Sequence, residues 1–163
     1  MPPLGAMINS LSHNPTPRSD SYPPPVDPKA LILLMGPRDD TREMLKVALE
    51  LWNYQVVEAE NSDDSIRLVK DRHPSVILMD TPLLFGETLN TLSKLHASDS
   101  IGRTPYIVLS GYPQESYRKE AWRRGAACFL VKPIDFDILR TYIDTLVEQT
   151  RNMEGSIEGN KLK

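Results

Sequence analysis

Three polar side chains in this sequence each come directly after a short apolar run, and they are Asp80, Ser110 and Lys132. The runs before them have the length and composition of buried strands. Because ligands of open α/β sheets bind at the carboxyl ends of the strands, we expect the acid, the hydroxyl and the amine to lie together there. Such a group predicts a site that handles phosphate.

Composition limits the classes of protein that could carry this site. The chain has 163 residues, enough for one domain with a proper core, and a formal net charge of −3. Its pI near 5.6 argues against broad nucleic-acid binding, which needs a clustered basic face. The longest apolar stretch, residues 30–36, is too short to span a bilayer, and the N-terminus lacks the features of a secretory signal. The single cysteine, Cys128, excludes an intramolecular disulfide, and a cytoplasmic protein is the simplest interpretation.

The chain divides into three parts. Residues 1–28 contain eight of the fourteen prolines and are expected to form a disordered, proline-rich tail. Residues 29–150 hold all the alternating apolar patterns and are expected to form the domain. Residues 151–163 are polar and contain two glycines, so we expect a flexible C-terminal tail. This segment is too short for an output domain, which favours a stand-alone domain.

Strand and helix patterns alternate between the tails. The β-rich runs are residues 30–35, 55–59, 75–79, 106–109 and 128–131. Five helical patterns follow these runs, with predicted starts at Asp40 (in a capping box with Glu43), Ser62 or Asp63, Thr88, Pro113 and Phe136. Single helices between strands predict a parallel sheet with right-handed crossovers. We therefore predict a five-stranded, doubly wound parallel α/β domain with five helices.

Three motifs make the chain resemble a response-regulator receiver domain of two-component signalling. Residues 121–134 are similar to the end of that family's fourth helix, its fifth strand and its lysine-proline turn. Residues 40–46 are similar to the start of its first helix, and residues 73–80 to the approach to its phosphorylated aspartate. The resemblance covers roughly residues 30–150. It implies a CheY-like, flavodoxin-like fold with the strand order 2-1-3-4-5.

The resemblance implies a role for each residue that matches the family's motifs. Asp80 would accept a phosphoryl group from a partner's phosphohistidine, and Ser110 and Lys132 would contact the phosphate oxygens. Phe129 matches the switch aromatic, whose rotamer is coupled to that hydroxyl in many members, and Pro133 matches the turn. A phosphoryl group adds strong acceptors and negative charge, enough to draw Ser110 and its loop inward.

The sequence departs from the family where a metal ion is held. The family's acidic pair, which binds Mg²⁺ together with the phosphoacceptor and a backbone carbonyl, falls here on Gly36-Pro37. Two carboxylate ligands of a hard cation are lost, which weakens the expectation of Mg²⁺ as a cofactor. The remaining candidate ligands are Asp80, Asp39 and the backbone carbonyl of Pro82, a proline that comes two residues after Asp80 instead of four.

The resemblance also implies protein partners. A histidine kinase or phosphotransfer protein would donate the phosphoryl group, and an output protein would bind the face of the fourth and fifth predicted helices. The fourth helical pattern carries the basic residues Arg118, Lys119, Arg123 and Arg124. We interpret them as a solvated face, with a partner contact as the second interpretation. No nucleic-acid or membrane partner is expected, and the chain is expected to be a phosphoacceptor or binding module, not an enzyme.

Three functions stay open at this point. The first is a phosphorelay receiver that accepts a phosphoryl group on Asp80. The second is a degenerate receiver that binds partners without phosphorylation, as the lost acidic pair favours. The third is a flavodoxin-like enzyme or nucleotide-binding protein, which would need a glycine-rich phosphate loop after the first strand. The sequence at that place, residues 36–40, is not such a loop.

Overall fold

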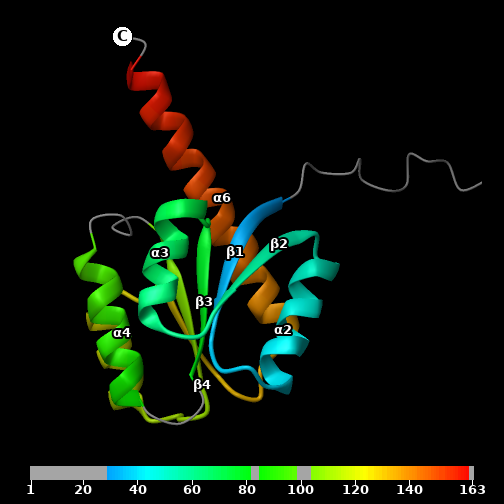
Figure 1. The fold of residues 1–163 in the computed structure, drawn as a ribbon, viewed down its shortest axis with the longest axis vertical. Coiled ribbons are helices and arrows are strands. Elements are labelled where there is room, and N and C mark those ends of the chain that lie inside the picture. The colour runs from blue at the N-terminus through cyan, green and yellow to red at the C-terminus, as the bar shows by residue number, and fades with distance from the viewer. Residues whose placement is uncertain (1–28, 82–84, 99–103, 162–163) are drawn as a thin grey trace, which may run out of the picture.

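The computed structural model describes residues 29–81, 85–98 and 104–161. Their strands form one parallel sheet in the predicted order, β2-β1-β3-β4-β5 (Figure 1). The strands are β1 Lys29–Met35, β2 Tyr54–Ala59, β3 Val76–Thr81, β4 Tyr106–Ser110 and β5 Cys128–Val131. The helices are α2 Asp40–Leu51, α3 Ser62–Arg72, α4 Phe85–Ala97, α5 Glu115–Arg123 and α6 Phe136–Lys161. The proline-rich segment, residues 1–28, lies outside the described residues.

Two apolar layers join the helices to the two faces of the sheet. Successive strand residues point to opposite faces, and β3 and β4 are buried along their whole length, as a doubly covered sheet requires. One layer includes Leu45 of α2 and Leu139 of α6. The other includes Val69 of α3, Leu95 of α4 and Ala121 of α5. With both faces covered, the carboxyl edge of the sheet is where polar side chains can gather.

Two helix caps differ from the predicted ones. Asp39 caps α2, because its Oδ1 accepts the Arg42 N–H at 2.9 Å, so the prediction of Asp40 as the cap was wrong. Asn61 caps α3 in the same way, accepting the Asp64 N–H at 2.9 Å. In each case an extended residue places a side-chain oxygen over the free N–H groups of the first turn. Several neighbouring residues can do this, and the sequence alone does not distinguish them.

The end of α5 is fixed by its contact with β4. The helix begins at Glu115, two residues after the predicted start at Pro113, and it ends before Gly125, which has a φ of 96°. The Tyr106 hydroxyl donates to the carbonyl oxygen of Arg124 at 2.6 Å. A Cβ on residue 125 would lie 2.8 Å from that hydroxyl oxygen, so glycine suits this position in both conformation and space.

Helix α6 continues well beyond its predicted end. It has 26 residues and extends past the sheet (Figure 1), whereas the sequence predicted a flexible tail from residue 151. Its contact with the sheet ends near Thr150, whose Oγ1 lies 3.4 Å from the carbonyl oxygen of Ser75. The side chains of residues 151–156 are exposed. Within the described ranges, no helix combines the length and apolar character that a membrane crossing needs.

These differences in burial predict unequal effects on stability. Ile143→Ala removes a fully buried side chain and should lower the free energy of unfolding by about 2–5 kcal/mol. Ending the chain after Arg151 should change it by less than about 0.5 kcal/mol, because the described side chains removed are exposed. Urea unfolding followed by circular dichroism measures both. A truncation as damaging as Ile143→Ala would show that the end of α6 packs on the domain.

Candidate functional site

The structure brings Asp80, Ser110 and Lys132 to the carboxyl edge of three neighbouring strands. Thr81, the residue after Asp80, is in register with Ser110 in β4. Ser110 is in register with Val131 in β5, and Lys132 follows directly. Asp80 therefore starts one residue before the level of Ser110 in the sheet, and Lys132 starts one residue after it.

Asp80 is the most deeply buried charged group of this site. Its side chain has 0% exposure and that of Lys132 has 24%, and the Lys132 ammonium forms an ion pair with Asp80 Oδ1. Apart from this ion pair, neither carboxylate oxygen accepts a hydrogen bond from the described residues. A buried charge without such bonds is strongly unfavourable unless an opposite charge lies beside it. The ion pair is therefore what makes a carboxylate tolerable here.

The two hydroxyls at this edge are held by the strands. Thr81 Oγ1 donates to the carbonyl oxygen of Leu109 at 2.7 Å. Ser110 is fully buried, and its Oγ accepts the Tyr112 N–H at 3.1 Å. The Ser110 carbonyl accepts the Lys132 N–H at 2.8 Å, and the Lys132–Pro133 peptide bond is cis. Ser110 therefore has a fixed position and a proton that it can still donate to a ligand oxygen.

Gly36 lies directly against Asp80. A Cβ on residue 36 would come within 3.0 Å of the Asp80 Cβ and 3.1 Å of its carbonyl oxygen. The Gly36 N–H donates to the carbonyl oxygen of Ala59 at 3.1 Å, so β1 keeps its pairing with β2 up to this residue. The segment to which the resemblance assigned the acidic pair thus does end beside Asp80, but its backbone passes too close for an ordinary side-chain contact.

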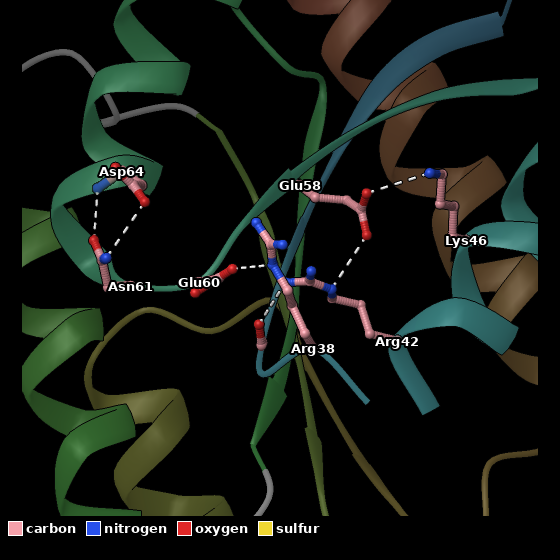
Figure 2. Close-up of polar contacts among 8 residues, drawn as sticks. Arg38, Arg42, Lys46, Glu58, Glu60, Asn61 and Asp64 are labelled. Atoms are coloured by element: carbon pink, nitrogen blue, oxygen red, sulfur yellow. Dashed lines mark hydrogen bonds and ion pairs between the residues drawn. The ribbon is translucent and has the colours of Figure 1, made fainter. Parts of the chain in front are cut away.

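A buried guanidinium organises the turn between β1 and α2. Arg42 Nη1 donates to the carbonyl oxygen of Gly36 at 2.8 Å, and its Nε lies 3.1 Å from Oε1 of Glu58 (Figure 2). Lys46 contacts the other oxygen of Glu58 at 3.3 Å, and this hydrogen bond raises the pKa of Lys46. The carboxylate of Asp39 is used as the cap of α2. The cationic side chain of Arg42 thus contacts the turn at which the resemblance placed an acidic pair.

The described residues beside Asp80 do not fit a resident Mg²⁺. This ion needs a near-octahedral set of oxygen ligands, but Gly36 and Pro37 have no side-chain oxygen and Asp39 is turned to α2. In the part of the chain that the structure describes, no three His, Cys, Asp or Glu side chains gather into a metal-binding group. The other predicted ligand, the carbonyl of Pro82, lies outside the described residues.

Phe129 points into the core on the α5 side of the sheet. Its side chain is buried, and the Arg118 guanidinium lies 5.8 Å from the centre of its ring. Two other members of the basic cluster, Arg123 and Arg124, lie 3.2 and 3.0 Å from the carboxylate of Glu120. The predicted switch aromatic therefore has an inward position, and a helical ion-pair network neutralises part of the cluster.

The sequence matches a known protein family. The family model described as "Response regulator receiver domain" matches residues 32–144, more than half of the chain. The chain belongs to the response regulator receiver domain family.

Sequence relatives within this receiver family differ in length. The chain is 29% identical over 117 residues to the regulatory protein AtoC of Escherichia coli (strain K12), and the matched region covers 72% of this chain and 25% of AtoC. The chain is also 29% identical over 111 residues to the protein PilH of Pseudomonas aeruginosa, and that matched region covers 67% of this chain and 92% of PilH. The receiver thus spans a quarter of the first relative and nearly all of the second.

Solved structures show the same fold. A putative response regulator from Chloroflexus aurantiacus superposes with a TM-score of 0.66 at 18% identity, covering 73% of this chain and 98% of that one. The receiver domain of a sensor histidine kinase from Pseudomonas aeruginosa PAO1 gives a TM-score of 0.65 at 19% identity, with the same coverage. The latter holds a magnesium ion in its active site cleft. At these identities the likeness extends to the fold, and the ion belongs to that protein.

Sequence reasoning did not identify Arg42 and Thr81 as part of the site. A signal for Arg42 was present, because it lies three and seven residues before Leu45 and Leu49 and so shares their buried stripe on α2. An arginine on a buried stripe needs an acceptor within the fold. Thr81 gave no such signal, since a threonine at the end of a strand is common and its bond to Leu109 depends on the strand pairing.

The ion pair predicts a large effect of removing its cation. Lys132→Met should lower the free energy of unfolding by on the order of 3 kcal/mol, because it leaves the Asp80 carboxylate buried and unpaired. Asp80→Asn combined with Lys132→Met should recover part of that loss. Denaturant unfolding of the three proteins measures it. An unchanged midpoint for Lys132→Met would mean that the pair does not stabilise the folded state.

The two arginines of the β1–α2 segment should differ in importance. Arg42→Ala removes a buried side chain that contacts both Gly36 and Glu58 and should cost about 2–3 kcal/mol. Arg38 forms an exposed pair with Glu60, and Arg38→Ala should cost less than about 1 kcal/mol. Thermal and urea unfolding compare the two variants. Equal losses would show that Arg42 does not hold the turn.

Proposed function

We propose that this receiver acts in a phosphorelay by accepting a phosphoryl group on Asp80 and passing the signal on by protein–protein contact. The observation that supports this proposal is the gathering of Asp80, Ser110 and Lys132 at one sheet edge. Family membership adds a general role in two-component signalling. The chain is in this view a phosphoacceptor and not an enzyme, and it works in the cytoplasm.

The side chains that accept the phosphoryl group and assist its transfer all belong to this chain. An Asp80 carboxylate oxygen attacks the phosphorus of a partner's phosphohistidine, and a P–O bond forms as the P–N bond breaks. The electron pair of that bond returns to the imidazole nitrogen, and Asp80 becomes an acyl phosphate. Lys132 supplies positive charge to the phosphoryl oxygens and Ser110 supplies a proton for a hydrogen bond, as phosphoryl transfer requires positioning and charge neutralisation.

Transfer would also change the charge balance of the site. A phosphoryl group brings about two negative charges and three acceptor oxygens to a place now balanced by one ammonium. Lys132 and Ser110 would turn to the new oxygens, which alters the end of β4 and its link to the β5 strand. Phe129 lies in that strand, next to Arg118 of α5. The α5–α6 face is therefore our proposed output surface, and it carries exposed apolar side chains in Trp122, Ile138 and Tyr142.

The phosphodonor also needs a docking surface, and α2 offers one. This helix starts just after the Gly36 turn and exposes three large apolar side chains, Met44, Val47 and Leu51, by 51%, 47% and 80%. An exposed apolar group of this kind on a polar helix is typical of a protein contact. We propose that a histidine kinase or phosphotransfer protein binds there.

A second candidate function is supported by the contact between Gly36 and Asp80. With no carboxylate at residues 36 and 37 and a Cβ at residue 36 excluded from ordinary contact, the receiver could bind its partners in the unphosphorylated state only. In that case Asp80 and Lys132 would serve as a buried structural pair. The third function considered from the sequence, a nucleotide-binding or flavin enzyme, has no further support.

Intact mass spectrometry after incubation with acetyl phosphate tests the proposal. We expect one phosphoryl adduct, absent in Asp80→Asn and present in the matched control Asp40→Asn, whose carboxyl is exposed at the start of α2. Because the described residues offer no metal site, EDTA in place of Mg²⁺ should leave the labelling rate unchanged.

Two results would count against this account of Asp80. An adduct that persists in Asp80→Asn would place the acceptor elsewhere. No adduct with acetyl phosphate and none with a phosphohistidine protein would leave the phosphorylation-independent receiver as the function.

A further inference from the structure

A groove runs beside the outer edge of β2, and its lining does not include Asp80 or Lys132. Its volume is about 730 Å³, and its lining includes five consecutive residues, 56–60, together with the first turn of α2 and Asp64 of α3. Consecutive strand residues point to opposite faces of a sheet. A single groove lined by four strand residues in a row, 56–59, must therefore follow the edge of the strand and not one face.

This edge of β2 has no neighbouring strand among the described residues. β2 is the outermost strand of the sheet, and its partner is β1. The carbonyl of Ala59 accepts the Gly36 N–H, so the peptide groups of Ala59 and, by alternation, Val57 face β1. Those of Val56 and Glu58 then face the groove. An edge of this kind can accept a further strand through main-chain hydrogen bonds.

The groove is also strongly acidic. Its lining holds two guanidiniums, Arg38 and Arg42, and six carboxylates, Asp39, Asp40, Glu43, Glu58, Glu60 and Asp64. Glu58 and Glu60 are already paired with the two arginines (Figure 2). Asp40 and Glu43 are exposed, and their carboxylates form no ion pair or hydrogen bond among the described residues. Asp64 lies 3.5 Å from the Arg67 guanidinium, so the negative charge left at the rim is on the α2 side.

We propose that this edge binds an extended segment of a partner protein that carries lysine or arginine side chains. The segment adds to β2 as a sixth strand, and its cations reach Asp40 and Glu43 on α2. Main-chain bonds to Val56 and Glu58 provide affinity, and the carboxylates select for basic residues. A second copy of this chain does not suit the same edge, because it would bring its own acidic groove against this one. The site is independent of Asp80 and of the proposed phosphoryl transfer.

The test uses the full chain and a fluorescent heptapeptide of alternating lysine and valine. Fluorescence anisotropy should show saturable binding, and amide signals of residues 56–60 should shift most in an ¹⁵N NMR titration. A peptide with glutamate in place of lysine should not bind. A peptide with proline in place of valine keeps the charge but cannot pair as a strand, and it should bind much more weakly.

Matched variants test which carboxylates attract the peptide. Asp40→Asn with Glu43→Gln should weaken binding about fivefold, as expected for two exposed charge pairs. Glu148→Gln with Glu154→Gln removes the same charge from exposed positions on α6 and should leave binding unchanged. Val56→Pro, which removes an N–H that faces the groove, should abolish strand addition; if this variant does not fold, the Asp40 and Glu43 variant still decides.

Several outcomes would overturn the proposal. Absence of binding, equal binding of the proline peptide, or shifts centred away from residues 56–60 would each reject strand addition at β2. Equal effects of the two charge variants would reduce the interaction to general attraction by an acidic chain. Self-association that competes with the peptide would assign the edge to a second copy of the chain.

Discussion

A carboxylate withdrawn entirely from solvent is stable only beside an opposite charge, and in this receiver the pair of Asp80 and Lys132 meets that constraint. The rest of the site follows from the need to keep the two groups together. Asp80 is near the end of a central strand that is buried along its whole length, so the strand holds it out of contact with water in this structure. Lys132 follows the edge strand β5, and its backbone is bonded to Ser110 in β4. Three strands must therefore be in register before the charge pair can form.

The turn between β1 and α2 is held by an arginine, and the described residues form no carboxylate cluster beside Asp80. Gly36 allows the end of β1 to approach Asp80, and Arg42 then holds the turn through the Gly36 carbonyl. The guanidinium of Arg42 is balanced in turn by Glu58. The result is a set of charge pairs, and the described residues do not form the carboxylate cluster that a divalent metal needs. This arrangement keeps Asp80, Ser110 and Lys132 at one sheet edge, and it places backbone and a buried arginine where the resemblance assigned the acidic pair.

Sequence patterns were sufficient for the sheet and for the residues at its carboxyl edge. Apolar runs gave the strands, and a polar residue at the end of three of them located Asp80, Ser110 and Lys132. The strand order came from the resemblance to a family. The loss of acidic residues at 36 and 37 was also visible in the sequence, but the contact of Gly36 with Asp80 was not, because it depends on how closely two non-consecutive strands approach.

Other features depend on tertiary structure in the same way. Asp39 and Asp40 are equivalent as caps in sequence, and the position of the first α2 turn selects Asp39. The continuation of α6 to Lys161 was missed because two glycines lower helix propensity, yet the helix crosses both of them. The acidic groove at β2 combines residues from β2, α2 and α3, and no single segment shows it.

The described residues around Asp80 do not form a fitting set of metal ligands, and an ¹⁵N NMR titration with Mg²⁺ is the measurement that can contradict this. We expect the amide signals of Gly36, Asp80 and Lys132 to stay unchanged through the millimolar range of Mg²⁺. Saturable shifts at these three residues that are lost in Asp80→Asn would be the contrary result. They would show that Asp80 binds a metal, and that the missing ligands come from the backbone or from water.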